Sequence, residues 1–99
     1  MLTPKEEIIL ALLQGSQKRY GLELVKASKG KLPRGTVYVF LKRLQDKGFI
    51  NSELRDSEAG KSGPPRRVYW LTGQGATALK AWNRYQAAQG KLKPGVAYG

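Results

Sequence analysis

Hydrophobic residues recur at helical spacing near the start of the chain, directly after a strong helix-initiation signal. Residues Thr3-Pro4-Lys5-Glu6 form a capping-box pattern with proline at the first helical position. The positions that follow predict a helix with one aliphatic side, and we expect it to end at Gly15. Its predicted core residues are Ile8, Ile9, Leu12 and Leu13.

Two further helices follow, each marked by apolar spacing and by a glycine or proline near one end. The second runs roughly from Gly21 to Ser28 and closes at Gly30, a common helix terminator. The third begins near Pro33 and reaches Asp46 or Lys47. One face of this third helix is apolar and is expected to pack against a core; it carries Val37, Phe40, Leu41 and Leu44.

The second half of the chain predicts a hairpin and a last helix. Residues 49–55 and 67–71 have the character of strands, and the glycines and prolines between them indicate a loop. Thr72 is a candidate N-cap for a helix through Gln86, although Gly73 and Gly75 lower helix propensity in its first turn. We therefore predict a mainly α protein with a small β-hairpin, an α+β fold in the order α-α-α-β-β-α.

The exposed side of the third helix is the most informative surface. Opposite its apolar stripe this segment presents hydroxyl and basic groups: Arg34, Thr36, Tyr38, Lys42, Arg43 and Lys47. Small polar and basic groups in the first turn, followed by more basic groups, suit a helix laid in the DNA major groove. A short strand and a basic loop come next. This order of elements is that of a winged helix-turn-helix.

The composition favours a polyanionic partner and excludes several kinds of chemistry. At 99 residues the chain is long enough for one domain with a modest core. Eighteen Lys and Arg against seven Asp and Glu give a net charge of +11, which favours nucleic acid first and acidic membranes second. The chain has no cysteine and no histidine, so disulfides, thiolate metal sites and histidine-based catalysis are excluded. We expect no enzyme activity, no cofactor and no metal.

The chain also lacks the signals of a membrane or secreted protein. The longest apolar run, from Ile8 to Leu13, is far shorter than the ~20 residues of a membrane span. The N-terminus has acidic residues where a signal peptide carries positive charge. We therefore expect a cytoplasmic protein with no membrane partner.

Motifs spread along the chain resemble those of the PadR family of bacterial transcriptional regulators. The resemblance covers roughly residues 6–82 with the motif order kept, and no single motif carries it. The family often has a proline after the tyrosine of its third helix, where this chain has Val39. The matching segments are Tyr20-Gly21-Leu22-Glu23-Leu24, Gly35-Thr36-Val37-Tyr38, Leu41-Lys42-Arg43-Leu44, Gly48-Phe49-Ile50 and Pro64-Pro65-Arg66-Arg67-Val68-Tyr69-Trp70-Leu71-Thr72.

The resemblance implies a dimeric winged-helix repressor whose single C-terminal helix builds the dimer interface. Residues 1–71 are then expected to form the winged helix-turn-helix DNA-binding domain and residues 72–89 the dimerisation helix. Residues 90–99 are expected to be a flexible tail.

Specific residues of the third helix are candidates for DNA contact. Arg34 would pair with guanine or with a phosphate, and Thr36 with a phosphate or a base edge. Gly35 would let backbone amides approach a phosphate. Lys42 and Arg43 would neutralise phosphates rather than read bases. Any one of these could be a solvated surface residue; their shared face is what favours a duplex.

Other candidates for DNA contact are more ambiguous. The hydroxyl of Tyr38 would bond a phosphate while its ring covers the helix-turn-helix core, or the residue is purely structural. The predicted hairpin, residues 49–71, would be the wing of this fold. In it, Lys61, Arg66 and Arg67 are candidates for contacts with the minor groove or the DNA backbone, and a loose charged loop is the alternative. Lys18 and Arg19, ahead of the second helix, are candidates for flanking phosphates.

The last helix carries large apolar groups beyond what a small winged-helix core needs. A dimer interface against the partner's first helix and its own equivalent explains them. The family resemblance also implies a planar aromatic effector that would stack on Trp82, although interface packing explains this residue equally well. The predicted dimerisation residues are Ile8, Leu12, Leu79, Trp82, Tyr85 and Gln86.

Three hypotheses for function follow. The leading one is a sequence-specific, homodimeric repressor of a pseudo-palindromic operator in double-stranded DNA. The second is a non-specific nucleic-acid-binding winged-helix protein, which would show steep salt dependence and little sequence preference. The third is a protein–protein adaptor that uses the same fold, against which the charge of +11 argues.

Overall fold

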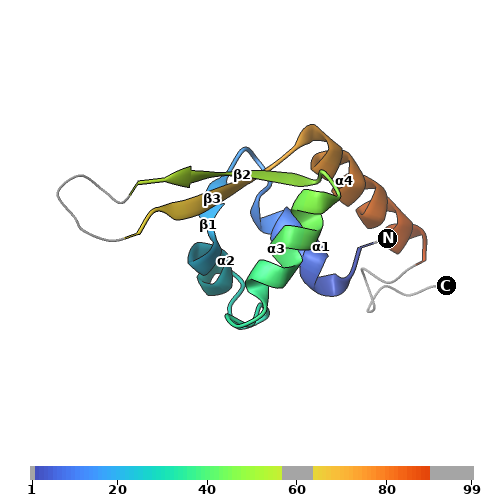
Figure 1. Ribbon diagram of the computed structural model, residues 1–99. Helices are drawn as coiled ribbons and strands as arrows, with labels where there is room; N and C mark the ends of the chain where they lie inside the picture. Colours follow the sequence, from blue (N-terminus) through green and yellow to red (C-terminus); the bar gives the residue numbers. More distant parts are fainter. Residues whose placement is uncertain (1, 57–63, 90–99) are drawn as a thin grey trace.

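The chain folds into helices packed on one side of a small sheet, with a hairpin projecting from it (Figure 1). The computed structural model describes residues 2–56 and 64–89. Within them the elements are α1 (Pro4–Leu12), β1 (Lys18–Tyr20), α2 (Gly21–Ala27), α3 (Val37–Asp46), β2 (Ile50–Arg55), β3 (Arg66–Leu71) and α4 (Gly73–Ala88). The predicted α+β class is confirmed, but the predicted order lacks β1.

The sheet has the order β1-β3-β2, with both pairs antiparallel. β2 and β3 form the predicted hairpin, in register from Ile50 opposite Leu71 to Arg55 opposite Arg66. β1 pairs with β3 on its other edge, with Arg19 opposite Tyr69. This strand is too short to show alternation in the sequence, and it exists because β3 offers it a partner.

The capping box at the start of α1 is confirmed. The Thr3 amide donates to Glu6 Oε1 over 2.9 Å, and the Glu6 amide donates to Thr3 Oγ1 over 3.2 Å. The helix ends at Leu12, before Gly15, which has a φ of 73°. A residue in this left-handed conformation is commonly glycine, because a β-carbon adds strain there.

The buried side of α1 differs in part from the prediction. Ile9 and Leu13 are fully buried as expected, and Leu10 joins them. Ile8 and Leu12 are only half-buried at the edge of the same core. The sequence contains a continuous apolar run here, so spacing alone did not identify the face that meets α3 and the sheet.

α3 begins later than its proline suggested. The Thr36 and Val37 amides both donate to the Pro33 carbonyl, over 3.2 and 3.0 Å, so residues 34–36 form a turn ahead of the helix. From Val37 onward the apolar stripe is as predicted, with Val37, Leu41 and Leu44 buried. Phe40 is half-buried at the edge of the core.

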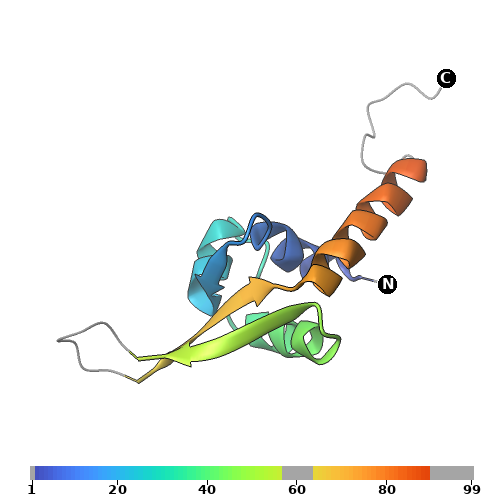
Figure 2. The ribbon, with the colours of Figure 1, turned by 90° about the horizontal axis from the view of Figure 1, so that it is seen from above.

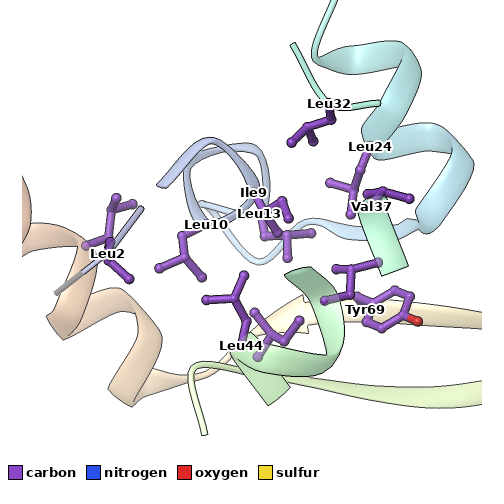
Figure 3. Close-up of a cluster of buried hydrophobic side chains, with 12 residues drawn as sticks. Leu2, Ile9, Leu10, Leu13, Leu24, Leu32, Val37, Leu44 and Tyr69 are labelled. Carbon is purple, nitrogen blue, oxygen red and sulfur yellow. The ribbon is translucent and has the colours of Figure 1, made fainter. Parts of the chain in front are cut away.

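The core lies where α1, α2, α3 and β3 converge (Figure 3). Leu24 of α2, Val37 of α3 and Tyr69 of β3 lie close together at one end of the cluster, and Leu2 lies near α4 at the other. Burying one such aliphatic side chain stabilises the fold by about 1.5–3 kcal/mol. This cluster therefore fixes α3 against the sheet.

α4 is attached to the turn between α3 and β2. Thr72 is its N-cap, accepting from the Gly75 amide over 3.0 Å and donating to the Gly48 carbonyl over 2.7 Å. A β-carbon at Gly75 would collide with the Phe49 carbonyl oxygen, so this glycine is required for close packing. α4 projects from the end of the molecule opposite the wing (Figure 2). None of the helices in the described ranges is both long and apolar enough to cross a membrane.

Candidate nucleic-acid interface

The solvent side of α3 and the turn before it carry most of the residues predicted to bind DNA. Arg34, Gly35, Thr36, Lys42 and Arg43 are all exposed. In the ribbon view α3 lies beside β2 and β3, the two strands of the projecting hairpin (Figure 1). The structure therefore brings these residues onto one surface, with Arg34, Gly35 and Thr36 in the turn and the other two on the helix.

Lys47 does not belong to this surface. Its ammonium lies 3.0 Å from Glu6 Oε2, and the Glu6 side chain is only 1% exposed. Lys47 is exposed as expected, but its ammonium pairs with α1, which the sequence did not predict. Burial alone raises the pKa of Glu6, but hydrogen bonds from Thr3 and the charge of Lys47 together hold this pKa below 4.5.

Tyr38 lies between α3 and the start of α2. A β-carbon at Gly21 would approach the Tyr38 ring to 2.6 Å, so the ring lies against the bare backbone of this glycine. Half of the Tyr38 side chain, 50%, remains exposed. The ring therefore covers the contact between the two helices, and half of the side chain remains exposed.

A polar groove separates α3 from the wing. It has a volume of 400 Å³ and is lined by Tyr38, Lys42, Gln45, Asp46, Arg67 and Tyr69. Arg67 Nη1 donates to Ser52 Oγ over 3.0 Å, and Ser52 Oγ donates to Gln45 Oε1 over 3.0 Å. This chain of hydrogen bonds joins β3 through β2 to α3 and holds the guanidinium beside the groove.

The charged and phenolic side chains that line the groove favour an anion. Lys42 lies 3.3 Å from Asp46, but both side chains are largely exposed, so this pair is weak. Burial raises the pKa of Tyr69 above 10 despite the nearby Arg67 charge, so its phenol stays protonated at neutral pH. Lys42, Arg67 and the phenols of Tyr38 and Tyr69 are the donor types that bind phosphate oxygens.

Arg66 and Arg67 are neighbours in sequence but point to opposite faces of β3, as successive strand residues do. The Arg66 guanidinium lies 4.2 Å from the centre of the Tyr20 ring, on the face away from the groove. The structure therefore brings Arg67, and not Arg66, together with α3. The third predicted wing residue, Lys61, lies outside the described residues.

The two basic residues of β1 have partners within the fold. Lys18 Nζ lies 5.0 Å from the centre of the Trp70 ring, a cation–π contact on the sheet. Arg19 Nε donates to the Leu12 carbonyl over 3.0 Å and so caps the end of α1. Arg19 thus has a structural role that its sequence position did not reveal.

Sequence reasoning missed one residue of the exposed face. Val39 is 51% exposed on the first turn of α3, between residues predicted to contact DNA. Its exposure follows from helix geometry, since it lies about 200° around the axis from buried Val37, at ~100° per residue. Helix spacing in the sequence could have identified this residue, because it places an aliphatic side chain on the polar side of the helix.

A second surface, on α4, carries the residues predicted to dimerise. An apolar depression of 310 Å³ is lined by Leu2, Phe49, Ala78, Ala81, Trp82 and Tyr85. Trp82 and Tyr85 stack with their ring centres 5.6 Å apart, and Tyr85 is exposed. We call these six residues the α4 apolar patch.

Other predicted dimerisation residues contribute to the core of their own chain. Leu79 is buried, and Ile8 and Leu12 pack at the core edge. Trp82 also contacts this core, and its Nε1 donates to Glu7 Oε1 over 3.1 Å. A partner subunit would therefore meet mainly Trp82, Tyr85 and the half-buried Gln86.

The helices α1, α2 and α3 pack on a three-stranded sheet, and α3 presents exposed cations beside the projecting hairpin. These features define a winged helix-turn-helix protein, a fold used for DNA binding. Residues 9–81 match the transcriptional regulator PadR-like family. The chain belongs to this family, whose members are regulators of transcription and not enzymes. Among the described residues there is no cluster of three or more acidic side chains that could hold a metal ion.

Solved structures of the family have the same fold. A PadR family regulator from Clostridium difficile is 26% identical, with a TM-score of 0.76 over 92% of this chain and 95% of that one. A PadR-like transcription factor from Bacteroides fragilis is also 26% identical, with a TM-score of 0.74 over 93% and 88%.

A third similar structure is Bacillus subtilis PadR in complex with operator DNA. It is 24% identical, with a TM-score of 0.69 over 78% of this chain and 45% of that one. The chain thus matches less than half of this longer protein. None of the curated proteins compared with the chain matches it.

Proposed function

We propose that this PadR-family regulator is a homodimeric repressor that binds a pseudo-palindromic operator in double-stranded DNA. The observation that carries the proposal is the exposed cationic side of α3, bordered by a groove that holds Arg67. The net charge of +11 favours a polyanion such as a duplex over an uncharged or basic partner. The similar Bacillus subtilis protein was solved with operator DNA, which agrees with this assignment.

In this proposal residues 1–71 form the DNA-binding domain, with α3 in the major groove. Arg34 and Thr36, in the turn ahead of α3, meet base edges or the nearest phosphates. Lys42, Arg43 and Arg67 neutralise phosphates along the major groove of the DNA. The Tyr38 hydroxyl donates to a phosphate while its ring remains against α2.

The wing contributes to DNA binding through cations that face the sugar-phosphate backbone of the duplex. Arg67 lies beside α3 and meets the same phosphate strand as Lys42. Arg66 and Lys61 extend the contact toward the adjacent minor groove, as wings of this fold do. Since Arg66 stacks on Tyr20 in the free protein, it has to leave that ring to reach the duplex.

The dimer forms through residues 72–89, which are α4 with its two cap residues, and through the α4 apolar patch. Exposed aromatic and apolar groups on one side of a projecting helix suit a two-fold interface, in which the same patch meets its own copy. Tyr85, Trp82 and Gln86 form the centre of the contact, and Ile8 and Leu12 of the partner lie at its edge. Two α3 helices related by this axis read half-sites about one helical turn, ~34 Å, apart or a small multiple of it.

Release from DNA follows from a change in the spacing of the two α3 helices. A planar aromatic effector that stacks on Trp82 in the α4 apolar patch would favour one spacing over another. The patch offers a stacked pair of rings and a depression of 310 Å³, which suits such a ligand. Binding to chromosomal DNA implies a cytoplasmic, nucleoid-associated protein.

The test is selection of duplexes from a random pool by the purified protein. The proposal predicts a palindrome with a fixed half-site distance. Enrichment of no sequence, together with steep salt dependence, would instead establish a non-specific nucleic-acid-binding protein. No binding of any duplex at low salt would leave the protein–protein adaptor.

Arg34→Ala then separates base contacts from phosphate contacts. We expect this variant to weaken binding to the selected duplex more than binding to random DNA, by about 1–3 kcal/mol if Arg34 pairs with guanine. An equal loss on both duplexes would limit Arg34 to a phosphate contact.

A further inference from the structure

Val39 is an aliphatic side chain held in solvent at the centre of the basic face of α3. It is 51% exposed, whereas the aliphatic residues on the core-facing side of α3, Val37, Leu41 and Leu44, are buried. The neighbouring Tyr38 is equally exposed, but its ring has a structural partner in Gly21. The exposed half of Val39 contributes nothing to the core.

Helix stability does not explain the residue. Valine loses rotamer freedom in a helix and is a poorer helix former than alanine or the long polar residues. The positions around it, one turn away on the same side, are Thr36, Lys42 and Arg43, all polar or cationic and all exposed. An apolar group beside one hydroxyl and two cationic side chains is therefore a local exception on this surface, and it points to a ligand with the same mixed character.

A DNA duplex presents that mixture in its major groove. Phosphates line the groove edges, donors and acceptors cover the base edges, and the 5-methyl group of thymine is the apolar group among them. Residues near the N-terminus of a recognition helix come closest to the bases. Val39 lies on the first turn of α3, on the side directed away from the core.

We propose that Val39 reads the 5-methyl group of a thymine in each half-site. The inference rests on the proposed function, and it adds a specificity-determining residue to it. The stiff χ1 of a helical valine holds its methyl groups in one orientation, so little rotamer freedom is lost on contact. Lys42 and Arg43, one turn further along, bind the flanking phosphates and fix the depth at which Val39 enters.

The test removes a single methyl group from the DNA. In the duplex selected from the random pool, each thymine is replaced in turn by deoxyuridine, which keeps the hydrogen-bonding edge and lacks the methyl. We expect one position in each half-site at which binding weakens about fourfold, the effect of one buried methyl group. At the same position, Val39→Ala should bind the thymine and uracil duplexes equally well.

A matched control comes from the wing. Leu54 is also an exposed aliphatic residue, 58% exposed, but it lies on β2 and not on α3. Leu54→Ala should keep the full fourfold sensitivity to uracil at the Val39 position. Val39→Ala is expected to fold as well as the parent protein, since alanine is the better helix former, and circular dichroism checks this.

The outcomes separate the inference from the proposed function. If a specific duplex is selected but no uracil substitution weakens binding, or if Val39→Ala retains the sensitivity, Val39 does not read thymine and the repressor proposal stands. If no specific duplex is selected, the proposed function fails, and the assignment of Val39 fails with it.

Discussion

The aromatic ring of Tyr38 on α3 lies directly against Gly21 at the start of α2, so close that a β-carbon there would meet the ring at 2.6 Å. Glycine therefore lets the two helices of the helix-turn-helix approach through a backbone-to-ring contact. The contact holds Tyr38 beside the polar groove with half of its side chain in solvent. The packing of α2 thus determines where a candidate DNA-binding hydroxyl lies.

This contact predicts a specific dependence between the two residues. Gly21→Ala should reduce the free energy of unfolding by about 0.5–1.5 kcal/mol, because the half-exposed Tyr38 ring has to leave its preferred rotamer to make room for the β-carbon. In a Tyr38→Ala background the same change should be neutral or stabilising, because the ring is absent and alanine has the better helix propensity. Urea unfolding of the four proteins measures both values.

Gly35→Ala is the control, since an added β-carbon there meets nothing within 4 Å. An equal cost of Gly21→Ala in both backgrounds would mean that the ring contact does not determine the choice of glycine at this position.

A second pair of glycines separates packing from helix propensity. Gly73 and Gly75 both lie in the first turn of α4, but only Gly75 lies against the Phe49 carbonyl. Gly73→Ala should stabilise the protein by up to about 1 kcal/mol. Gly75→Ala should destabilise the protein by about 1–3 kcal/mol or more, as overpacking does. Thermal unfolding compares the two, and equal shifts would rule out the close approach.

The Glu6–Lys47 pair predicts a loss of stability in acid. The pKa of Glu6 in the folded protein is below its ordinary value of 4.5. A carboxylate with a depressed pKa contributes stability above the unfolded value, and this contribution is lost as the pH falls through the folded value. The free energy of unfolding should therefore decline as the pH drops below about 4.5, which urea titrations at several pH values would measure.

Glu6→Gln isolates this contribution. The variant should be less stable near neutral pH by about 1–3 kcal/mol, because a buried charged hydrogen-bond acceptor is lost. Its acid decline should be shallower than that of the parent protein. Glu53→Gln, on an exposed strand position, should keep the full decline. A Glu6→Gln profile parallel to the parent profile would contradict the role of this carboxylate.

The proposed dimer predicts that truncating the α4 apolar patch produces monomers. Tyr85→Ala should give monomers at micromolar concentration with an unchanged fold, because Tyr85 is exposed in the single chain. Trp82→Ala should also give monomers and weaken operator binding in step, with an added stability cost from the lost Glu7 hydrogen bond. Light scattering measures the mass.

Lys80→Ala, on the other side of α4, serves as the control and should leave the dimer intact. A dimer that persists in both Tyr85→Ala and Trp82→Ala would remove the patch from the interface.

Local signals allowed much of the fold to be predicted from the sequence. The Thr3 capping box, the Thr72 cap and the apolar stripe of α3 each depend on residues a few positions apart, and the structure has all three. Non-local contacts account for the misses. β1 forms only because β3 is available beside it, and Lys47 turns toward Glu6 because α1 packs next to the end of α3.

The candidate site divides in the same way. The helix period alone places Lys42 and Arg43 opposite the core stripe. The pairing of Arg67 with Ser52 and Gln45 depends on strand register, which no local pattern encodes. Val39 was visible as an apolar residue on the polar side, but its exposure could be established only after the core-facing side of α3 was known.

Two double charge reversals that change the net charge by the same amount test whether α3 is the surface that binds DNA. Arg34→Glu with Arg43→Glu alters the exposed face of α3, and Lys80→Glu with Arg84→Glu alters α4. Fluorescence anisotropy with the selected duplex at fixed salt gives both affinities. We expect a loss of affinity of ~100-fold or more for the α3 pair and of less than ~10-fold for the α4 pair. Equal losses would mean that only total charge matters, and that α3 is not the surface that meets DNA.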